Sequence, residues 1–197
     1  MSIFATPYTD AFCVQAARLI FDALPAAVAD GGDLAARTDM ANAATIAGLA
    51  MANAFVGVNH ALAHAVGARF SLAHGRVNGI FLPHVMRYNA ALPTKFMPAP
   101  GYSAYVAPEK YAKLGWVLFG GHGEDEQRRR LFTRVDELLS TVGIPRTLRE
   151  AGVDAAEFEA AIPQLLQAAF EDPSIRTNPR MPLLRELELL LRAAYGA

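Results

Sequence analysis

The sequence predicts an all-α fold, and three observations support that prediction. First, 38 of the 197 residues are alanine, which has the highest helix propensity and lets helices approach closely. Second, apolar residues in most segments recur at three- and four-residue spacing, as they do along one face of a helix. Third, no stretch longer than about four residues alternates apolar and polar side chains, so strands are hard to place. We therefore expect a multi-helix bundle of about eight helices without an internal repeat.

The first helices are predicted from apolar spacing and from one capping residue. Apolar positions indicate a helix over residues 10–29, and Pro25 is expected to end or kink it. After a glycine turn, Asp33 is the expected N-cap of a second helix that runs to about Asn53. Because this second helix is apolar on nearly every side, we expect it to be buried.

The middle of the chain continues the helical pattern as far as a proline-rich break. Residues 57–70 and 75–92 are both predicted to be helical, the second segment with an interruption at Pro83. Residues 93–108 hold four prolines and show no periodicity, so an ordered surface loop is expected there.

The C-terminal part predicts four further helices. They are expected over 111–119, 131–142, 154–169 and 184–194. Gly120 and Gly121 are expected to close the first of these. Thr147 with Glu150, and Asp154 with Glu157, have the spacing of a capping box.

Composition and charge exclude several classes of protein. A net charge of −1 gives no global field that would recruit nucleic acid or an anionic membrane. Apolar residues make up 53% and charged residues 19%, the opposite of a disordered chain. The longest strictly apolar run is about ten residues, and no basic residue precedes Arg18, so no membrane span or secretory signal is predicted. Cys13 is the only cysteine and is expected in the core. We expect a cytoplasmic protein.

Three of the five histidines form the first candidate site. These three fall within fifteen residues and are His60, His64 and His74. His60 and His64 are four residues apart, so on a helix they lie one turn apart on the same face. His74 is expected at the mouth of the following helix. Two imidazoles on one face and a third from a neighbouring element are a plausible divalent-metal constellation. The alternative is that these are hydrogen-bonded structural histidines, although burying several unpaired imidazoles costs free energy.

Other candidate residues favour structural roles. His84 and His122 carry no partner pattern and are assigned to structure. The run Arg128–Arg130 is short and interleaved with acids, which is typical of a solvated helix face rather than a nucleic-acid contact. The run Asn178–Arg180 reads as a turn and N-terminal cap before the last helix.

The histidine tract closely resembles the signature of the iron-containing alcohol dehydrogenases. The run is NAFVGVNHALAHAVGARFSLAHGRVNGIFLPHVMRYNA, in which Gly57 precedes His60, Ala63-His64 follows, and His74-Gly75 comes ten residues later. The similarity extends over the whole chain. It is greatest to the alcohol-dehydrogenase half of bifunctional aldehyde/alcohol dehydrogenases and to propanol dehydrogenases, through the runs at 93–95, 143–153 and 177–187.

The resemblance implies a fold, a reaction and roles for the histidines. It implies that residues 1–197 are the helical C-terminal, metal-binding domain of an enzyme that interconverts short-chain primary alcohols and aldehydes. It implies that His60 and His74 bind a catalytic Fe(II), or Zn(II) in some members, and that NAD(P) is the cofactor. By the same resemblance His64 is not a metal ligand but lies beside the nicotinamide and substrate, as a catalytic and cofactor-binding residue.

The chain also departs from the family pattern. The family's other two metal ligands come from a D-A-x-x-H segment upstream of the TDA-type run, which is Thr9–Ala11 here, and this sequence shows no such segment. We also expect the family's N-terminal dinucleotide-binding domain to be missing from this chain. We therefore expect a chain that is incomplete for catalysis and that either needs a dinucleotide-binding domain or self-associates through an apolar face of residues 40–75. The alternative function is a non-catalytic helical fragment that associates with full-length relatives.

Overall fold

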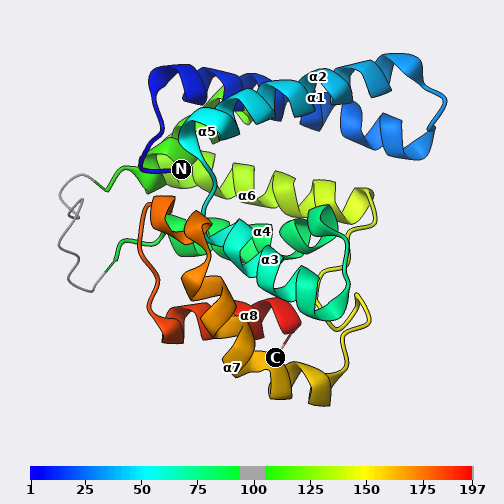
Figure 1. The fold of residues 1–197 in the computed structure, drawn as a ribbon. Coiled ribbons are helices and arrows are strands. Elements are labelled where there is room, and N and C mark those ends of the chain that lie inside the picture. Colours follow the sequence, from blue (N-terminus) through cyan, green and yellow to red (C-terminus); the bar gives the residue numbers. More distant parts are fainter. Residues whose placement is uncertain (94–104, 197) are drawn as a thin grey trace. The chain divides into compact units, whose positions relative to one another are not determined.

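The structure is a computed structural model that describes residues 1–93 and 105–196 (Figure 1). These residues form helices and no strand, so the all-α prediction is confirmed. The elements in chain order are α1 (Pro7–Ala29), α2 (Leu34–Ala54), α3 (Val58–Phe70), α4 (His74–Ala90), α5 (Ala107–Phe119), α6 (Glu124–Thr141), α7 (Ala155–Glu171), the 3-10 helix η2 (Pro173–Thr177) and α8 (Leu184–Tyr195).

The chain divides into two compact units. Unit 1 comprises Val56–Pro108 and Ile144–Ala197 together with Met1, and unit 2 comprises Ser2–Phe55 and Glu109–Gly143. Unit 1 therefore holds α3, α4, α7, η2 and α8, whereas unit 2 holds α1, α2, α6 and most of α5. All three histidines of the candidate site belong to unit 1.

Within unit 2, α1 and α2 lie side by side as a helical hairpin (Figure 1). Asp33 caps the start of α2 as predicted, because its side chain accepts a hydrogen bond from the Ala36 N–H. Most of the buried residues of both helices are small and lie seven positions apart, which is two turns along one face. They are Thr9, Ala16 and Ala23 on α1, and Ala36, Ala43 and Ala50 on α2.

Two predictions for this hairpin are wrong, and of the two expectations for Pro25 the structure excludes one. α1 does not end at Pro25 but continues to Ala29, because the missing N–H of that proline costs one hydrogen bond in the last turns. α2 is mostly exposed, since only its alanine stripe packs, and Leu34 is 77% accessible. Cys13 is also exposed rather than in the core.

Helix α1 is also the one helix among the described residues whose length and hydropathy would alone suffice for a membrane span. Its most apolar window has a mean hydropathy of 1.5, and 11% of that window is buried within the protein. A search for uninterrupted apolar runs misses it, because charged residues such as Arg18 and Asp22 interrupt the sequence.

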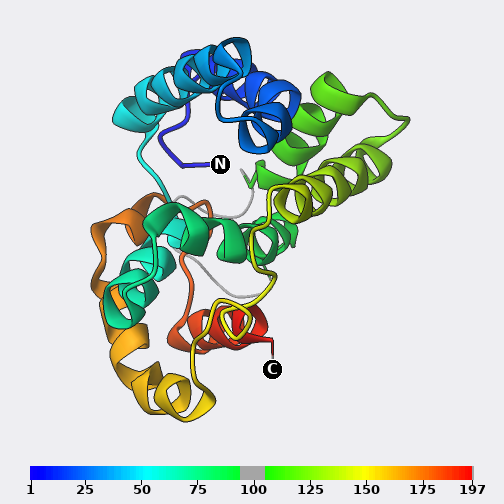
Figure 2. The same ribbon diagram turned by 90° about the vertical axis from the view of Figure 1, so that its right-hand side faces the viewer.

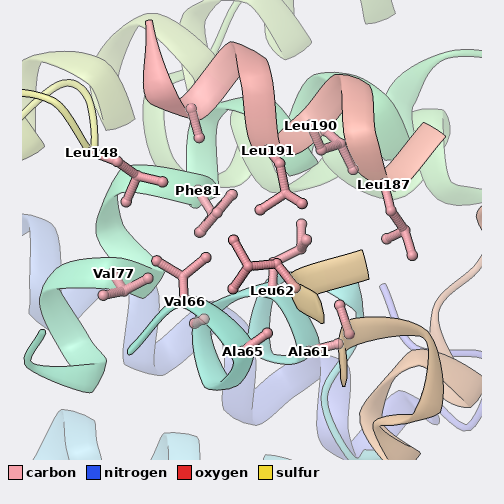
Figure 3. Packing of buried hydrophobic residues seen from close by; sticks show 14 of the residues in the cluster. Ala61, Leu62, Ala65, Val66, Val77, Phe81, Leu148, Leu187, Leu190 and Leu191 are labelled. Carbon is pink, nitrogen blue, oxygen red and sulfur yellow. The ribbon is translucent and has the colours of Figure 1, made fainter. Parts of the chain in front are cut away.

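Unit 1 is built around a core to which α3, α4 and α8 contribute. α3 packs on both α4 and α7, and α8 packs on the same two helices (Figure 2). Figure 3 shows Leu62 and Val66 of α3, Phe81 of α4 and Leu191 of α8 pointing toward one another. All four side chains are fully buried. This core fixes the helices that carry the three histidines.

Some of the remaining helices differ from their predicted bounds, and α6 begins at Glu124, seven residues before the predicted start. α4 is continuous through Pro83, where an interruption was expected. α5 begins at Ala107, before the predicted start, and the predicted loop lies largely outside the described residues. Asp154 caps α7 as its sequence spacing predicts, with hydrogen bonds from two backbone N–H groups.

Candidate metal centre

The structure brings His60, His64 and His74 together in unit 1. His60 and His64 stand one turn apart on α3, and His74 is the first residue of α4, as the sequence predicts. The ring centroids are 6.0 Å apart for His60 and His64, 5.3 Å for His60 and His74, and 5.2 Å for His64 and His74. Each ring therefore lies next to the other two.

A tight connection between α3 and α4 produces this grouping. α3 ends at Ser71, which adopts a left-handed conformation with φ 53°. The Leu72 N–H then donates to the Gly67 carbonyl oxygen at 3.2 Å, which closes the helix end. His74 follows two residues later and begins α4, so the chain folds back and returns an imidazole to the histidine face of α3.

The first turn of α3 is capped from a distant part of the chain. Its N-cap residue, Gly57, has no side chain to offer, and the Val58 N–H donates instead to Oδ1 of Asn178 at 3.2 Å. Nδ2 of Asn178 donates in turn to Oδ1 of Asn89 at 2.9 Å and to the Arg180 carbonyl oxygen at 2.8 Å. The sequence predicts only a local turn and cap for Asn178, so this long-range contact is not predicted.

Gly57 is required by this cap, and we expect Gly57→Ala to destabilise the protein. A Cβ at this position would lie 2.6 Å from Oδ1 of Asn178, which is held in place by its own hydrogen bonds. Displacing that oxygen leaves the buried Val58 N–H without its partner, so the free energy of unfolding should fall by about 1–3 kcal/mol in urea denaturation. Gly75→Ala is the matched control, because nothing lies within 4 Å of a Cβ there. Equal effects of both substitutions would contradict the capping role.

The orientation of the rings favours one pair as ligands of a single ion. Two imidazoles bound to one tetrahedral ion at about 2 Å have their centroids about 5 Å apart. His60 and His74 meet this spacing with planes tilted by 55°, so lone pairs in the two ring planes are able to converge. His64 and His74 are stacked at 19°, which leaves their lone pairs in nearly parallel planes. The pair His60 and His74 therefore fits a shared metal ion.

A three-histidine metal site, which the sequence spacing also allows, is not formed. Across residues 1–93 and 105–196, no three His, Cys, Asp or Glu side chains are grouped so that they could hold a metal ion. His64 is instead engaged by a carboxylate, since its Nδ1 lies 2.7 Å from Oδ2 of Asp172.

The two candidate ligands differ in their surroundings. Burial lowers the pKa of half-buried His60, and the neighbouring His74 and His64 lower it further. The neutral imidazole is the form that binds a metal. Nε2 of His74 lies 3.0 Å from Nδ2 of Asn78, whose Oδ1 accepts a hydrogen bond from Asn59 at 2.7 Å. Coordination through Nε2 of His74 thus requires the Asn78 amide to move aside.

Asp172, which contacts His64, is not predicted from the sequence, and neither is Asn78, which contacts His74. Asp172 lies 108 residues from His64 and, as the N-cap of η2, carries only a local signal in the sequence. A groove of about 430 Å³ lies between α3 and α7 and includes this pair in its lining. It is lined by His64, Ala65, Ala68, Arg69, Gln164, Leu165, Ala168 and Asp172.

The other candidate residues have local structural contacts. His84 lies in the middle of α4, outside the histidine cluster. The backbone N–H of His122 donates to Oε2 of Glu126 at 2.9 Å, beside the start of α6. Arg130 of the basic run forms an ion pair with Glu126 one turn away, as expected of a solvated helix face.

Comparison with known proteins identifies relatives over nearly the whole chain. Residues 1–195 match the Fe-containing alcohol dehydrogenase family, C-terminal part. Aldehyde-alcohol dehydrogenase 2 of Entamoeba histolytica is 37% identical over 196 residues, which are 99% of this chain and 22% of the relative. 1,3-Propanediol dehydrogenase of Klebsiella pneumoniae is 34% identical over 194 residues, 97% of this chain and 46% of the relative.

Solved structures agree with these relatives. A crystal structure of 1,3-propanediol oxidoreductase, 34% identical, superposes with a TM-score of 0.85 over 98% of this chain and 47% of that one. The structure of the iron-containing alcohol dehydrogenase of Thermococcus thioreducens is 29% identical in sequence and superposes with a TM-score of 0.83, over 100% of this chain and 46% of that one. The chain thus spans 22% of the length of the first relative and less than half of the others. It belongs to the Fe-containing alcohol dehydrogenase family, as a match to the C-terminal part of that family.

Proposed function

We propose that this chain is the metal-binding helical part of an alcohol dehydrogenase that interconverts short-chain primary alcohols and aldehydes. The observation that carries the proposal is the tilted pair of His60 and His74, 5.3 Å between centroids, with His64 stacked beside it. In the complete enzyme, a divalent iron ion (or zinc) would supply Lewis-acid chemistry and NAD(P) the redox chemistry.

The three histidines would have different roles at this site. His60 offers a neutral nitrogen, because burial and its histidine neighbours disfavour its protonation. His74 offers a second nitrogen from the start of α4. His64 remains outside the ligand pair and is held beside it by Asp172, where it would meet the substrate and the nicotinamide.

Two histidines alone make a weak metal site, so further ligands must complete it. Four protein ligands, one of them an anionic carboxylate, are expected from the family resemblance, and this chain supplies two of the four. If each missing ligand costs about 2–3 kcal/mol, two of them weaken binding by roughly three to four powers of ten. We propose that an upstream aspartate and histidine, with a dinucleotide-binding domain, supply the rest of the site.

We expect the purified 197-residue chain to lack measurable alcohol oxidation with NAD or NADP and to purify without stoichiometric iron or zinc. Hydride transfer requires a positioned dinucleotide, and this chain presents only the helical side of the site. The test is a chimera in which this chain replaces the matching 194 residues of the Klebsiella pneumoniae 1,3-propanediol dehydrogenase. The chimera should recover both metal, by elemental analysis, and turnover of short primary alcohols. Robust turnover by the homogeneous chain alone, or a folded chimera without metal, would overturn the proposal.

A second candidate function is association with a full-length relative without catalysis. The observation that favours it is a group of exposed apolar side chains at the end of α2, where Phe55 is 60%, Met51 50% and Leu49 49% accessible. Light scattering at tens of micromolar distinguishes the outcomes. Self-association or a stable complex with a full-length relative supports this function. A monodisperse monomer that does not bind a full-length relative counts against it.

A further inference from the structure

One contact in unit 1 links α3 to the start of η2 and lies outside the metal-ligand pair. Nδ1 of His64 and Oδ2 of Asp172 are 2.7 Å apart, the distance of a charge-assisted hydrogen bond. The His64 side chain is 45% accessible, whereas that of Asp172 is 15% accessible. An exposed imidazole is therefore anchored to a largely buried carboxylate.

The carboxylate itself is fixed by the fold. Oδ1 of Asp172 accepts the backbone N–H of Ser174 at 2.8 Å, which is the N-cap hydrogen bond of η2. The Asp172 N–H donates to the Ala168 carbonyl oxygen at the end of α7, and Ile175 of η2 is buried in the core. One oxygen is thus committed to the backbone, and the other faces the histidine.

The charge state of Asp172 determines which proton the ring carries. Burial raises the pKa of Asp172, but hydrogen bonds from Ser174 and His64 outweigh it and hold the pKa below its usual range. A carboxylate is only an acceptor, so the ring atom that faces it must be a donor. In the neutral ring, the proton therefore sits on Nδ1 and Nε2 keeps its lone pair.

We infer that Asp172 is a positioning residue for His64: it holds the ring in the Nδ1–H form, so that Nε2 is the acceptor that meets the substrate hydroxyl. The ring is constrained twice, at its edge by Asp172 and at its face by the stacked ring of His74. His64 and Asp172 both line the groove between α3 and α7. The substrate part of this inference rests on the proposed function, whereas the placement of the proton does not.

The test reads the proton on His64 directly. Long-range proton–nitrogen NMR of the ¹⁵N-histidine-labelled 197-residue chain, treated with chelator and held at one pH above neutrality, distinguishes a protonated from an unprotonated ring nitrogen. We expect His64 to show Nδ1 protonated and Nε2 unprotonated. A wild-type spectrum with the proton on Nε2 overturns the inference, whether or not any variant folds.

Asp172→Asn removes the charge and keeps an acceptor for the Ser174 N–H, so the start of η2 should stay capped. We expect the ratio of Nδ1–H to Nε2–H forms of His64 to fall about tenfold or more, since hydrogen bonds to charged groups are worth about 1.5–3 kcal/mol. Asp154→Asn, at the N-cap of α7, is the matched control and should leave the ratio unchanged. An unchanged ratio in Asp172→Asn refutes the role.

A second readout separates this inference from the proposed function. In the chimera, Asp172→Asn should keep the metal content of the unsubstituted protein and lower kcat. Loss of metal in this variant would make Asp172 part of the metal site and contradict the inference. If the chimera binds no metal at all, the proposed function fails, while the NMR result on the chain still decides the role of Asp172.

Discussion

His60→Ala and His74→Ala are expected to abolish metal retention in the chimera, whereas His64→Ala should keep the metal and lose turnover. His60 and His74 are the tilted pair whose spacing fits one shared ion. His64 has its Nδ1 committed to Asp172 and its ring stacked on His74, so its removal takes no nitrogen from that pair. Each lost ligand should weaken binding by about 2–3 kcal/mol, which is roughly 30- to 160-fold.

Elemental analysis of the three purified variants decides this assignment. His122→Ala is the matched control, because His122 is exposed and belongs to unit 2, whereas the three histidines of the site belong to unit 1. That control should keep both metal and turnover. Loss of metal in His64→Ala together with its retention in His74→Ala would mean that the ligand pair is His64 with His60, and the assignment would be wrong.

The sequence predicts the helices well because their signals are local. Periodic apolar positions locate each helix, and the capping residues Asp33 and Asp154 mark two starts at the position that the structure shows. Prolines are misleading because a helix whose neighbours pack tolerates one missing hydrogen bond, as α4 does at Pro83. The histidine cluster is equally predictable, since His60 and His64 share a helix and a short turn returns His74.

Burial and long-range polar contacts escape prediction because they depend on what each helix meets. α2 is apolar on nearly every side, yet its alanines are small enough for one stripe to pack on α1 while Leu34 and Leu49 stay exposed. Asp172 and Asn178 look like local turn residues in the sequence. Only the fold shows that the first holds His64 and the second caps the histidine helix.

Substitution of Arg180, the last residue of the Asn178–Arg180 turn, is expected to have the largest effect on stability. Its guanidinium pairs with Oε1 of Glu186 at 2.7 Å, with both side chains largely buried, and donates to the carbonyl oxygens of Tyr88 and Ala91. It also lies over the Tyr88 ring, 3.9 Å from its centroid. These contacts join the end of α4 to the segment before α8.

We expect Arg180→Ala to lower the free energy of unfolding by about 3–5 kcal/mol, because it removes one partner of a largely buried ion pair together with the hydrogen bonds to the carbonyl oxygens of Tyr88 and Ala91. Urea denaturation measures the loss. Arg192→Ala is the matched control, since Arg192 also pairs with two glutamates, Glu159 and Glu188, but on an accessible surface where water replaces the partner. Stability should change little in that control. Similar losses in the two variants would show that the largely buried pair of Arg180 and Glu186 contributes no more to stability than a surface pair, and would contradict this prediction.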